Sequence, residues 1–242
     1  MKVVKAEDLR IIKKFNYGAF SDVFLVEYDN HIFCYKHFNT RYPNDILNNI
    51  SKLGDLDTCS SFITPTILIE HNNRLIGYLS NYNKDLEELD FVTYKTNQIF
   101  YLKQTKELIE KLHNDYGRIH GDVSSTNVLV DKENRKSYLI DFDSSLYLNQ
   151  SLESRFSFST EVLDFIYKYR LEKATEGIDI YKFNITTLML LYGIDDVDLL
   201  FYKIEKNKLH NSKVNKDIKV LTKELLLESR NPYSNQYIID YI

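Results

Sequence analysis

The stretch RIHGDVSSTNVLVDKENRKSYLIDFDSS, residues 118–145, is the most informative part of this sequence. It places Asp122, Asn127 and Asp141 each beside an apolar run. The apolar runs predict two short strands, 127–131 and 138–142, joined by the polar turn KENRK. A hairpin that begins at Asn127 and ends at Asp141 brings these polar side chains to the same end of the strand pair.

Two interpretations of these three side chains are open. Any one of them, taken alone, is typical of a polar residue that closes a turn. Together they offer oxygen ligands for a divalent metal and one more carboxylate that can face a hydroxyl group. Phosphoryl transfer needs this combination, because the metal neutralises phosphate charge and the carboxylate orients the nucleophile.

The composition is that of an ordinary globular protein. The chain has 242 residues, with 43% hydrophobic and 27% charged residues, enough for one large domain or two small lobes. A net charge of -4 predicts no nucleic-acid partner. Cys34 and Cys59 are too few for a disulfide framework or a zinc site.

The first residues, MKVVKAEDLRIIKK, lack the apolar core of a signal peptide, and no apolar run is long enough to predict a membrane segment. We therefore expect a cytoplasmic protein where it is synthesised. Signal-independent export to another compartment or host stays open.

The order of elements predicts an α+β fold with two lobes. Strands are expected at 9–15, 22–28 and 32–38, and the last two are expected to form a hairpin that turns tightly at Asp29 and Asn30. A helix is expected at 45–56, and a second hairpin that turns at Asn72 and Asn73. Helices are expected at 96–116, ending near Gly117, and at 180–191 and 217–227. We expect a small antiparallel sheet with one helix in residues 1–82 and a mostly helical lobe in 83–242.

HGDVSSTN followed by IDFD resembles the catalytic loop and metal motif of the protein kinase superfamily, HRD-x-x-x-x-N and DFG. The resemblance implies that Asp122 is the catalytic base and that Asn127 and Asp141 bind Mg²⁺ or Mn²⁺. It also implies ATP as the phosphate donor, with His120 and Phe142 as internal packing residues that link the lobes.

The segment YGAFSDVFLV resembles the second half of the kinase glycine-rich loop. The resemblance places Gly18 at a glycine position, Phe20 at the tip and Val23 over the adenine. Asn16 and Ser21 stand at the other two glycine positions. Because glycine lets backbone N–H groups approach phosphates closely, we expect this loop to hold phosphate less tightly.

Lys36, in FCYKHF, stands where the family has its phosphate-contacting lysine. The alternative interpretation is an exposed lysine on an edge strand. In an alternating strand, however, Lys36 shares its face with Cys34 and Phe38. The resemblance further places the adenine against the backbone of Ser80, Asn81 and Tyr82.

The glutamate that pairs with this lysine in the family is missing. No Glu occurs between His37 and Ile69, and NISKLGDL places Asn49 at the glutamate position. Asp45, one turn earlier, could substitute as the partner of Lys36. Asp143 replaces the glycine of DFG, either as a further metal ligand or as a cap of the turn.

Further similarity lies downstream. FSTEVL resembles the APE element with Glu161 as its acid, and GIDIYKF resembles the helix whose aspartate, here Asp179, anchors the catalytic loop. The closing segment would supply Arg230 as the partner of Glu161. Gly121 replaces the arginine of HRD, so we expect the activation segment to become ordered without phosphorylation.

Ser124 stands where Ser/Thr kinases place a lysine. The loop is similar to the RIO and KEOPS kinases and to aminoglycoside and choline phosphotransferases. Three functions therefore compete: a compact, atypical Ser/Thr protein kinase, a small-molecule kinase, and a pseudokinase scaffold. The sequence favours the first, with a protein substrate and with autophosphorylation in the Ser-rich segment 144–160.

Overall fold

The computed structural model describes residues 1–17, 21–39, 49–152, 158–206, 208–209, 222–224, 226 and 236–242. The chain divides into two compact units. Unit 1 comprises Met1–Asp85 and Ile140–Asp143, and unit 2 comprises Leu86–Leu139 and Ser144–Ile242. The short IDFD segment thus groups with the first unit although most of its sequence neighbours belong to the second.

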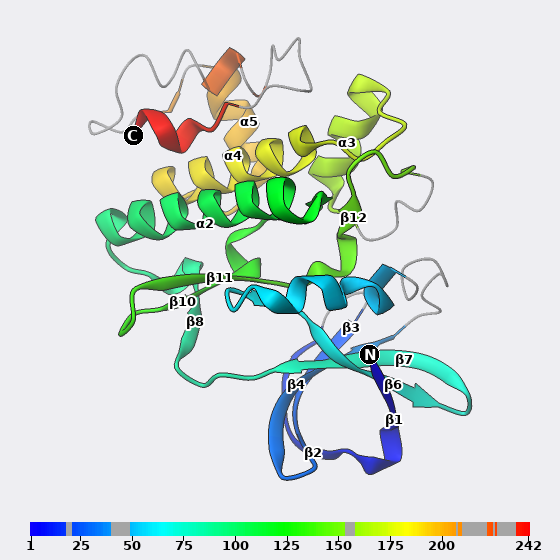
Figure 1. The fold of residues 1–242 in the computed structure, drawn as a ribbon. Coiled ribbons are helices and arrows are strands. Elements are labelled where there is room, and N and C mark those ends of the chain that lie inside the picture. Colours follow the sequence, from blue (N-terminus) through cyan, green and yellow to red (C-terminus); the bar gives the residue numbers. More distant parts are fainter. Residues whose placement is uncertain are drawn as a thin grey trace. The chain divides into compact units, whose positions relative to one another are not determined.

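Unit 1 is built on a six-stranded sheet with the order β1-β6-β7-β4-β3-β2 (Figure 1). Its strands are β1 (Lys2–Lys5), β2 (Arg10–Tyr17), β3 (Ser21–Tyr28), β4 (His31–Phe38), β6 (Pro65–His71) and β7 (Arg74–Asn81). The unit also contains β5 (Phe62–Ile63) and the 3₁₀ helices η1 (Ala6–Asp8) and η2 (Leu53–Thr58).

The expectation of a purely antiparallel sheet was wrong at one edge. β1 pairs with β6 in parallel, with Lys2 opposite Ile67 and Lys5 opposite Glu70. Four residues are too few to show an alternating pattern, and the partner strand lies far along the chain. The other strand pairs of this sheet are antiparallel, as predicted.

The two tight hairpins were predicted correctly. Asp29 and Asn30 have φ values of 51° and 60°, and Asn72 and Asn73 have 51° and 58°. Two consecutive positive φ angles suit the right-handed twist of the flanking strands, and Asn and Asp tolerate them better than other non-glycine residues. These turns fix the register of β3 with β4 and of β6 with β7.

Part of the predicted helix 45–56 is observed. Residues 49–51 are helical, and the chain then tightens into η2, while residues 45–48 lie outside the described residues. The core of unit 1 contains Val26, Ile69 and Leu79, all fully buried. Because apolar burial is the main stabilising contribution to folding, this core makes the sheet a rigid support for the side chains on its other face.

Unit 2 is mostly helical, as predicted. Its helices are α2 (Lys95–Tyr116), α3 (Thr160–Tyr169), α4 (Glu176–Tyr192) and α5 (Val197–Glu205), with 3₁₀ helices η3 (Leu89–Phe91), η4 (Ser125–Asn127) and η6 (Ile238–Tyr241). α2 and α4 pack side by side (Figure 1). α2 ends where predicted, because Gly117 adopts φ 60° and closes the helix. The predicted helix 217–227 lies largely outside the described residues.

Short strands position the central loop of unit 2. β10 (Val128–Asp131) pairs antiparallel with β11 (Lys136–Ile140) and with β8 (Leu86–Glu88). β9 (Arg118–Ile119) pairs antiparallel with β12 (Leu146–Tyr147). The hairpin of β10 and β11 was predicted, whereas β8, β9 and β12 were missed because two or three residues carry no periodic signal. The 3₁₀ helix η5 (Phe142–Ser144) follows β11.

Within the parts of the chain that the structure describes, no helix is both long enough and apolar enough to cross a membrane.

Candidate active site

Side chains of helix α4 fix the loop between β9 and β10 by hydrogen bonds. Asp179, which is fully buried, accepts hydrogen bonds from the backbone N–H groups of His120 at 2.8 Å and Gly121 at 2.7 Å. His113 Nε2 lies 2.9 Å from the same carboxylate. Thr186 donates to the carbonyl of Val123 at 2.9 Å. The predicted anchoring of the loop backbone by Asp179 is therefore observed.

The buried carboxylate of Asp179 is kept ionised by its neighbours. Burial alone raises its pKa, but the hydrogen bond and charge of His113, the charge of His120 and the His120 backbone N–H lower it more. The net pKa is lowered from its ordinary value. Asp179 therefore remains a charged acceptor, which strengthens its bonds to the loop backbone.

Asp122 and Asn127 are joined within this loop. Asn127 Nδ2 donates to the backbone carbonyl of Asp122 at 2.9 Å and to its Oδ2 at 3.3 Å. The backbone N–H of Asp122 donates to His120 Nδ1 at 3.3 Å. The side-chain nitrogen of Asn127 donates these hydrogen bonds to Asp122. The side-chain oxygen is therefore the atom of Asn127 that can bind a metal.

A buried lysine stands beside Asp122, and the motif analysis missed it. Lys182, on α4 and 7% exposed, places its Nζ 3.1 Å from Glu161 Oε2 and 3.6 Å from Asp122 Oδ1. Glu161 is the acid of the predicted APE element, and its described partner is Lys182, whereas Arg230 lies outside the described residues. A signal was present, because Lys182 is the one charged residue in the apolar run 180–191.

Gly121 is required by the loop's conformation. Its φ is +86°, and a Cβ atom at this position would lie 2.5 Å from the Ser144 carbonyl oxygen and 2.7 Å from a ring carbon of Phe158. The positive φ disfavours any residue with a Cβ atom, and the surrounding atoms leave no space for a larger side chain. The backbone and packing around residue 121 therefore require glycine, where the kinase motif has arginine.

In unit 1, the predicted site residues Val23 and Lys36 and the additional residue Tyr78 lie side by side on three neighbouring strands. Val23 on β3 is the register partner of Lys36 on β4, and Lys36 is the register partner of Tyr78 on β7. Directly opposite residues on neighbouring strands point to the same face of a sheet. Lys36 is therefore on a central strand and faces inward, which excludes the alternative of an exposed edge lysine.

Lys36 meets two carboxylates from the IDFD segment. Its Nζ lies 2.6 Å from Asp141 Oδ1 and 2.7 Å from Asp143 Oδ2. Burial lowers the pKa of Lys36, but the charges of Asp141 and Asp143 raise it more, so the net pKa is raised. The ammonium group is thus charged and held between two anions.

The backbone of the IDFD segment turns sharply so that both aspartates reach Lys36. Asp141 has φ 63°, in the left-handed region. Phe142 is 1% exposed and packs its ring 5.6 Å from that of Phe62. Phe142 is thus an internal packing residue of unit 1, and its packing fixes the backbone between Asp141 and Asp143.

The remaining predicted nucleotide contacts lie at the end of β7 or outside the described residues. Ser80 is within the sheet, with register partners Pro65 and Cys34 on its two sides. Asn81 pairs with Phe33, and Tyr82 follows the strand, where it is 37% exposed. Gly18 and Phe20 lie outside the described residues.

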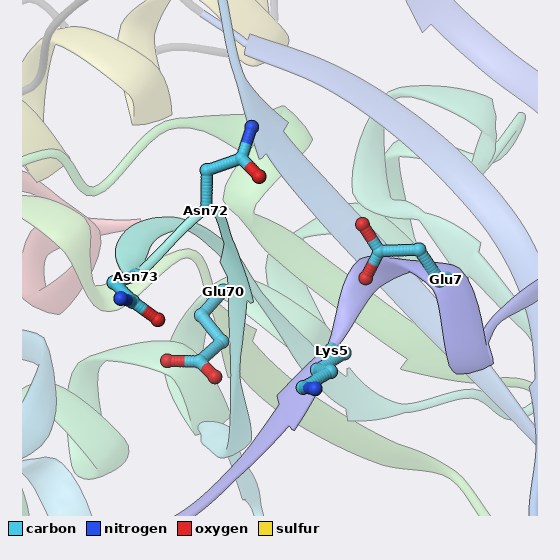
Figure 2. A pocket seen from close by; sticks show the side chains of 5 residues that line it. All are labelled: Lys5, Glu7, Glu70, Asn72 and Asn73. Carbon is cyan, nitrogen blue, oxygen red and sulfur yellow. The ribbon is translucent and has the colours of Figure 1, made fainter.

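A separate concave surface lies at the β1 edge of the sheet in unit 1. Figure 2 shows the five residues that line it, Lys5, Glu7, Glu70, Asn72 and Asn73. Two carboxylates and one ammonium group give this surface a net negative charge, which disfavours a phosphate ligand. The charge of this surface therefore does not favour it as a nucleotide site.

Comparison with known proteins supports the fold. A solved structure described as that of the Cydia pomonella granulovirus kinase PK-1 matches with a TM-score of 0.68 and 17% sequence identity, over 97% of this chain and 94% of that one. No protein-family model matches the sequence, and no curated protein does. The chain therefore shares its fold with this viral kinase, and the likeness is one of fold alone.

Proposed function

We propose that this chain is an ATP-dependent phosphotransferase that uses Mg²⁺ or Mn²⁺ and transfers the γ-phosphate to a Ser or Thr hydroxyl of a protein. The observation that carries the proposal is the loop of Asp122 and Asn127, held by the buried carboxylate of Asp179, in a chain with a kinase fold. A scaffold that binds only through its surface has no physical need for this arrangement.

Asp122 serves as the acceptor of the proton from the substrate hydroxyl. The hydroxyl oxygen forms a bond to the γ-phosphorus, the bond from that phosphorus to the bridging oxygen breaks, and ADP leaves with the electron pair. The ammonium group of Lys182 lies 3.6 Å from Asp122 Oδ1 and helps to hold this carboxylate in place. His120, through its contact with the Asp122 backbone, helps to fix the carboxylate in place.

Asn127 and Asp141 are the proposed metal ligands. Each residue offers an oxygen of the kind that a hard divalent cation prefers, an amide oxygen in Asn127 and a carboxylate that is 32% exposed in Asp141. The metal, when bound, neutralises charge on the phosphates. Lys36 supplies a positive charge for the phosphates nearer the adenosine.

Val23 is proposed to cover the adenine, since it lies on the same sheet face as Lys36. Of the three backbone positions proposed for the adenine edge, Asn81 and Tyr82 are better placed than Ser80, which has strand neighbours on both sides. Gly18 and Phe20 remain proposed contacts of the phosphates.

The proposed test is the intact mass of the purified protein after incubation with Mg²⁺ and ATP, beside the Asp122→Ala variant. Autophosphorylation predicts added phosphate in the wild type and none in the variant. Equal phosphate on both would contradict the role of Asp122. No phosphate on either would contradict autophosphorylation, and ATP consumption with small hydroxyl compounds would then separate a small-molecule kinase from a scaffold.

A further inference from the structure

Asp143 has no part in the chemistry proposed above, yet it is one of the most enclosed carboxylates of unit 1. Its side chain is 5% exposed. Burying a carboxylate is costly unless ion pairs and hydrogen bonds replace its water. Both of its oxygens have such partners: Oδ2 lies 2.7 Å from Lys36 Nζ, and Oδ1 accepts a hydrogen bond from the Tyr78 hydroxyl at 2.8 Å.

The two carboxylates that meet Lys36 differ in exposure. Asp141 is 32% exposed, whereas Asp143 is 5% exposed. Under the proposed function, Asp141 binds the metal. The metal then competes with Lys36 for this carboxylate, so the ion pair between Lys36 and Asp141 is weakened. Asp143 is then the carboxylate that continues to hold the lysine.

The sheet explains why Tyr78 can fix Asp143. Tyr78 and Lys36 are directly opposite one another on β7 and β4, so their side chains share one face. Tyr78 is 4% exposed and packs its ring edge-on against Phe38 at 6.0 Å. The Tyr78 hydroxyl therefore has little conformational freedom. Through its hydrogen bond, it fixes the carboxylate of Asp143 relative to strand β7.

We propose that Asp143, held by Tyr78, is the positioning residue for Lys36 and takes the place of the helix glutamate that this chain lacks. Asn49 stands at that glutamate position in the sequence, and an amide cannot form an ion pair. This inference rests on the proposed function, since it assigns the group that orients the phosphate-contacting lysine. It replaces the two roles suggested by sequence, a metal ligand or a turn cap.

The test compares Asp143→Asn and Tyr78→Phe with wild type at saturating ATP. Misplacing a catalytic group by about 1 Å can cost on the order of 100-fold in rate, so we expect kcat of Asp143→Asn to fall by roughly 10- to 100-fold. Tyr78→Phe keeps both charges and should lose less, about threefold to tenfold. Tyr35→Phe is the matched control, because it removes a buried hydroxyl from the residue next to Lys36 on the opposite face of β4.

The magnesium dependence separates positioning from metal binding. A positioning role predicts that kcat falls while the half-saturating Mg²⁺ concentration stays at the wild-type value. A metal-ligand role predicts a higher Mg²⁺ requirement, and that result would overturn the inference. Wild-type kcat in a folded Asp143→Asn protein would overturn it as well.

Thermal unfolding identifies any variant that fails to fold. If Asp143→Asn is unfolded, Tyr78→Phe carries the test, and wild-type kcat in that variant would contradict the proposal. An inactive wild type would instead contradict the proposed function. Mg-ATP affinity, measured with a fluorescent ATP analogue, then tests Asp143 alone: weaker binding in Asp143→Asn supports its hold on Lys36, and equal binding contradicts it.

Discussion

Asp141 carries the most direct residue-scale prediction. It is the more exposed of the two carboxylates beside Lys36, and it is the proposed ligand of the metal. Asp141→Asn keeps the size of the side chain but removes the charge that binds the cation. Since metal stabilisation of phosphoryl transfer amounts to several kcal/mol, we expect metal-dependent turnover to fall by about 100-fold or more.

The measurement is ATP turnover with and without added Mg²⁺, with the circular dichroism spectrum as the check on folding. Turnover equal to that of wild type in Asp141→Asn would remove Asp141 from the metal site.

Cys34 gives a second residue-scale prediction, one of pH dependence. Burial raises the pKa of the Cys34 thiol to about 11, against smaller opposing effects of Ser80 and Lys36. The thiolate is the reactive form, so it forms only as the pH rises toward that value. We expect Cys34 in the folded protein to react slowly with iodoacetamide at pH 8 and faster after unfolding in urea, as read by peptide mass spectrometry. Rapid labelling of the folded protein at pH 8 would contradict the raised pKa of this partly buried thiol.

At the residue scale, the sequence singled out Lys36, Asp122, Asn127 and Asp141 as proposed site residues, but it did not predict the ion pairs of Lys36 with Asp141 and Asp143. Residues 36 and 143 are far apart in sequence, and their meeting depends on the left-handed backbone of Asp141. No periodic pattern reports such a turn. Lys182 was similarly missed as a neighbour of Asp122, because contacts between a helix and a loop leave no fixed spacing in the sequence.

At the scale of elements, the buried Asp179 links α4 to the loop after β9. Its pKa is lowered in the folded state from the ordinary 3.8, so its ionised form stabilises the fold above that pH. This stability is lost as the pH falls through the lower, folded-state pKa. Because hydrogen bonds to charged groups contribute about 1.5–3 kcal/mol, we expect Asp179→Asn to lower the free energy of unfolding by roughly that amount at pH 7.

Urea unfolding at neutral pH and at a pH below 3.8 measures this difference. The difference in the free energy of unfolding between wild type and Asp179→Asn should be smaller at the acidic pH. An equal gap at both pH values would show that the charge of Asp179 is not the source of the stabilisation.

Gly121 gives a prediction for the same loop. Gly121→Ala adds a Cβ atom 2.5 Å from the Ser144 carbonyl at a positive φ, so the backbone must move. A strained residue of this kind costs on the order of 1–3 kcal/mol, and we expect a loss of stability of at least that size together with lower activity.

Gly54→Ala is the matched control, because a Cβ atom there meets no atom within 4 Å. Gly121→Arg, which restores the residue of the kinase motif, should be at least as harmful as the alanine. A stable, active Gly121→Arg protein would contradict the packing described for this loop.

The elements that could be predicted are those with local signals. The Asp29–Asn30 and Asn72–Asn73 turns and the end of α2 at Gly117 follow from residue types that accept positive φ. β1, β8, β9 and β12 have four residues or fewer, and their pairing partners are distant in sequence. Their positions follow from tertiary packing, which local patterns do not contain.

At the scale of the whole molecule, fold and function have different support. The kinase fold extends over nearly the whole chain, at a sequence identity that shows the fold alone. The phosphotransferase activity is inferred from particular side chains. The fold was predictable because a few motif residues hold a fixed spacing, whereas the acceptor was not, because substrate contacts follow no comparable motif.

The most direct test of the account is the rate of ADP formation from ATP by wild type and by Asp122→Asn, each with Mg²⁺ and with excess chelator. The side-chain volume is nearly unchanged, so the comparison removes the charge and the proton-accepting group of this side chain with little change in packing. We expect magnesium-dependent ADP formation by wild type and a rate at least about 100-fold lower for the folded variant. Equal rates in the two proteins, or a wild-type rate that chelator leaves unchanged, would contradict it.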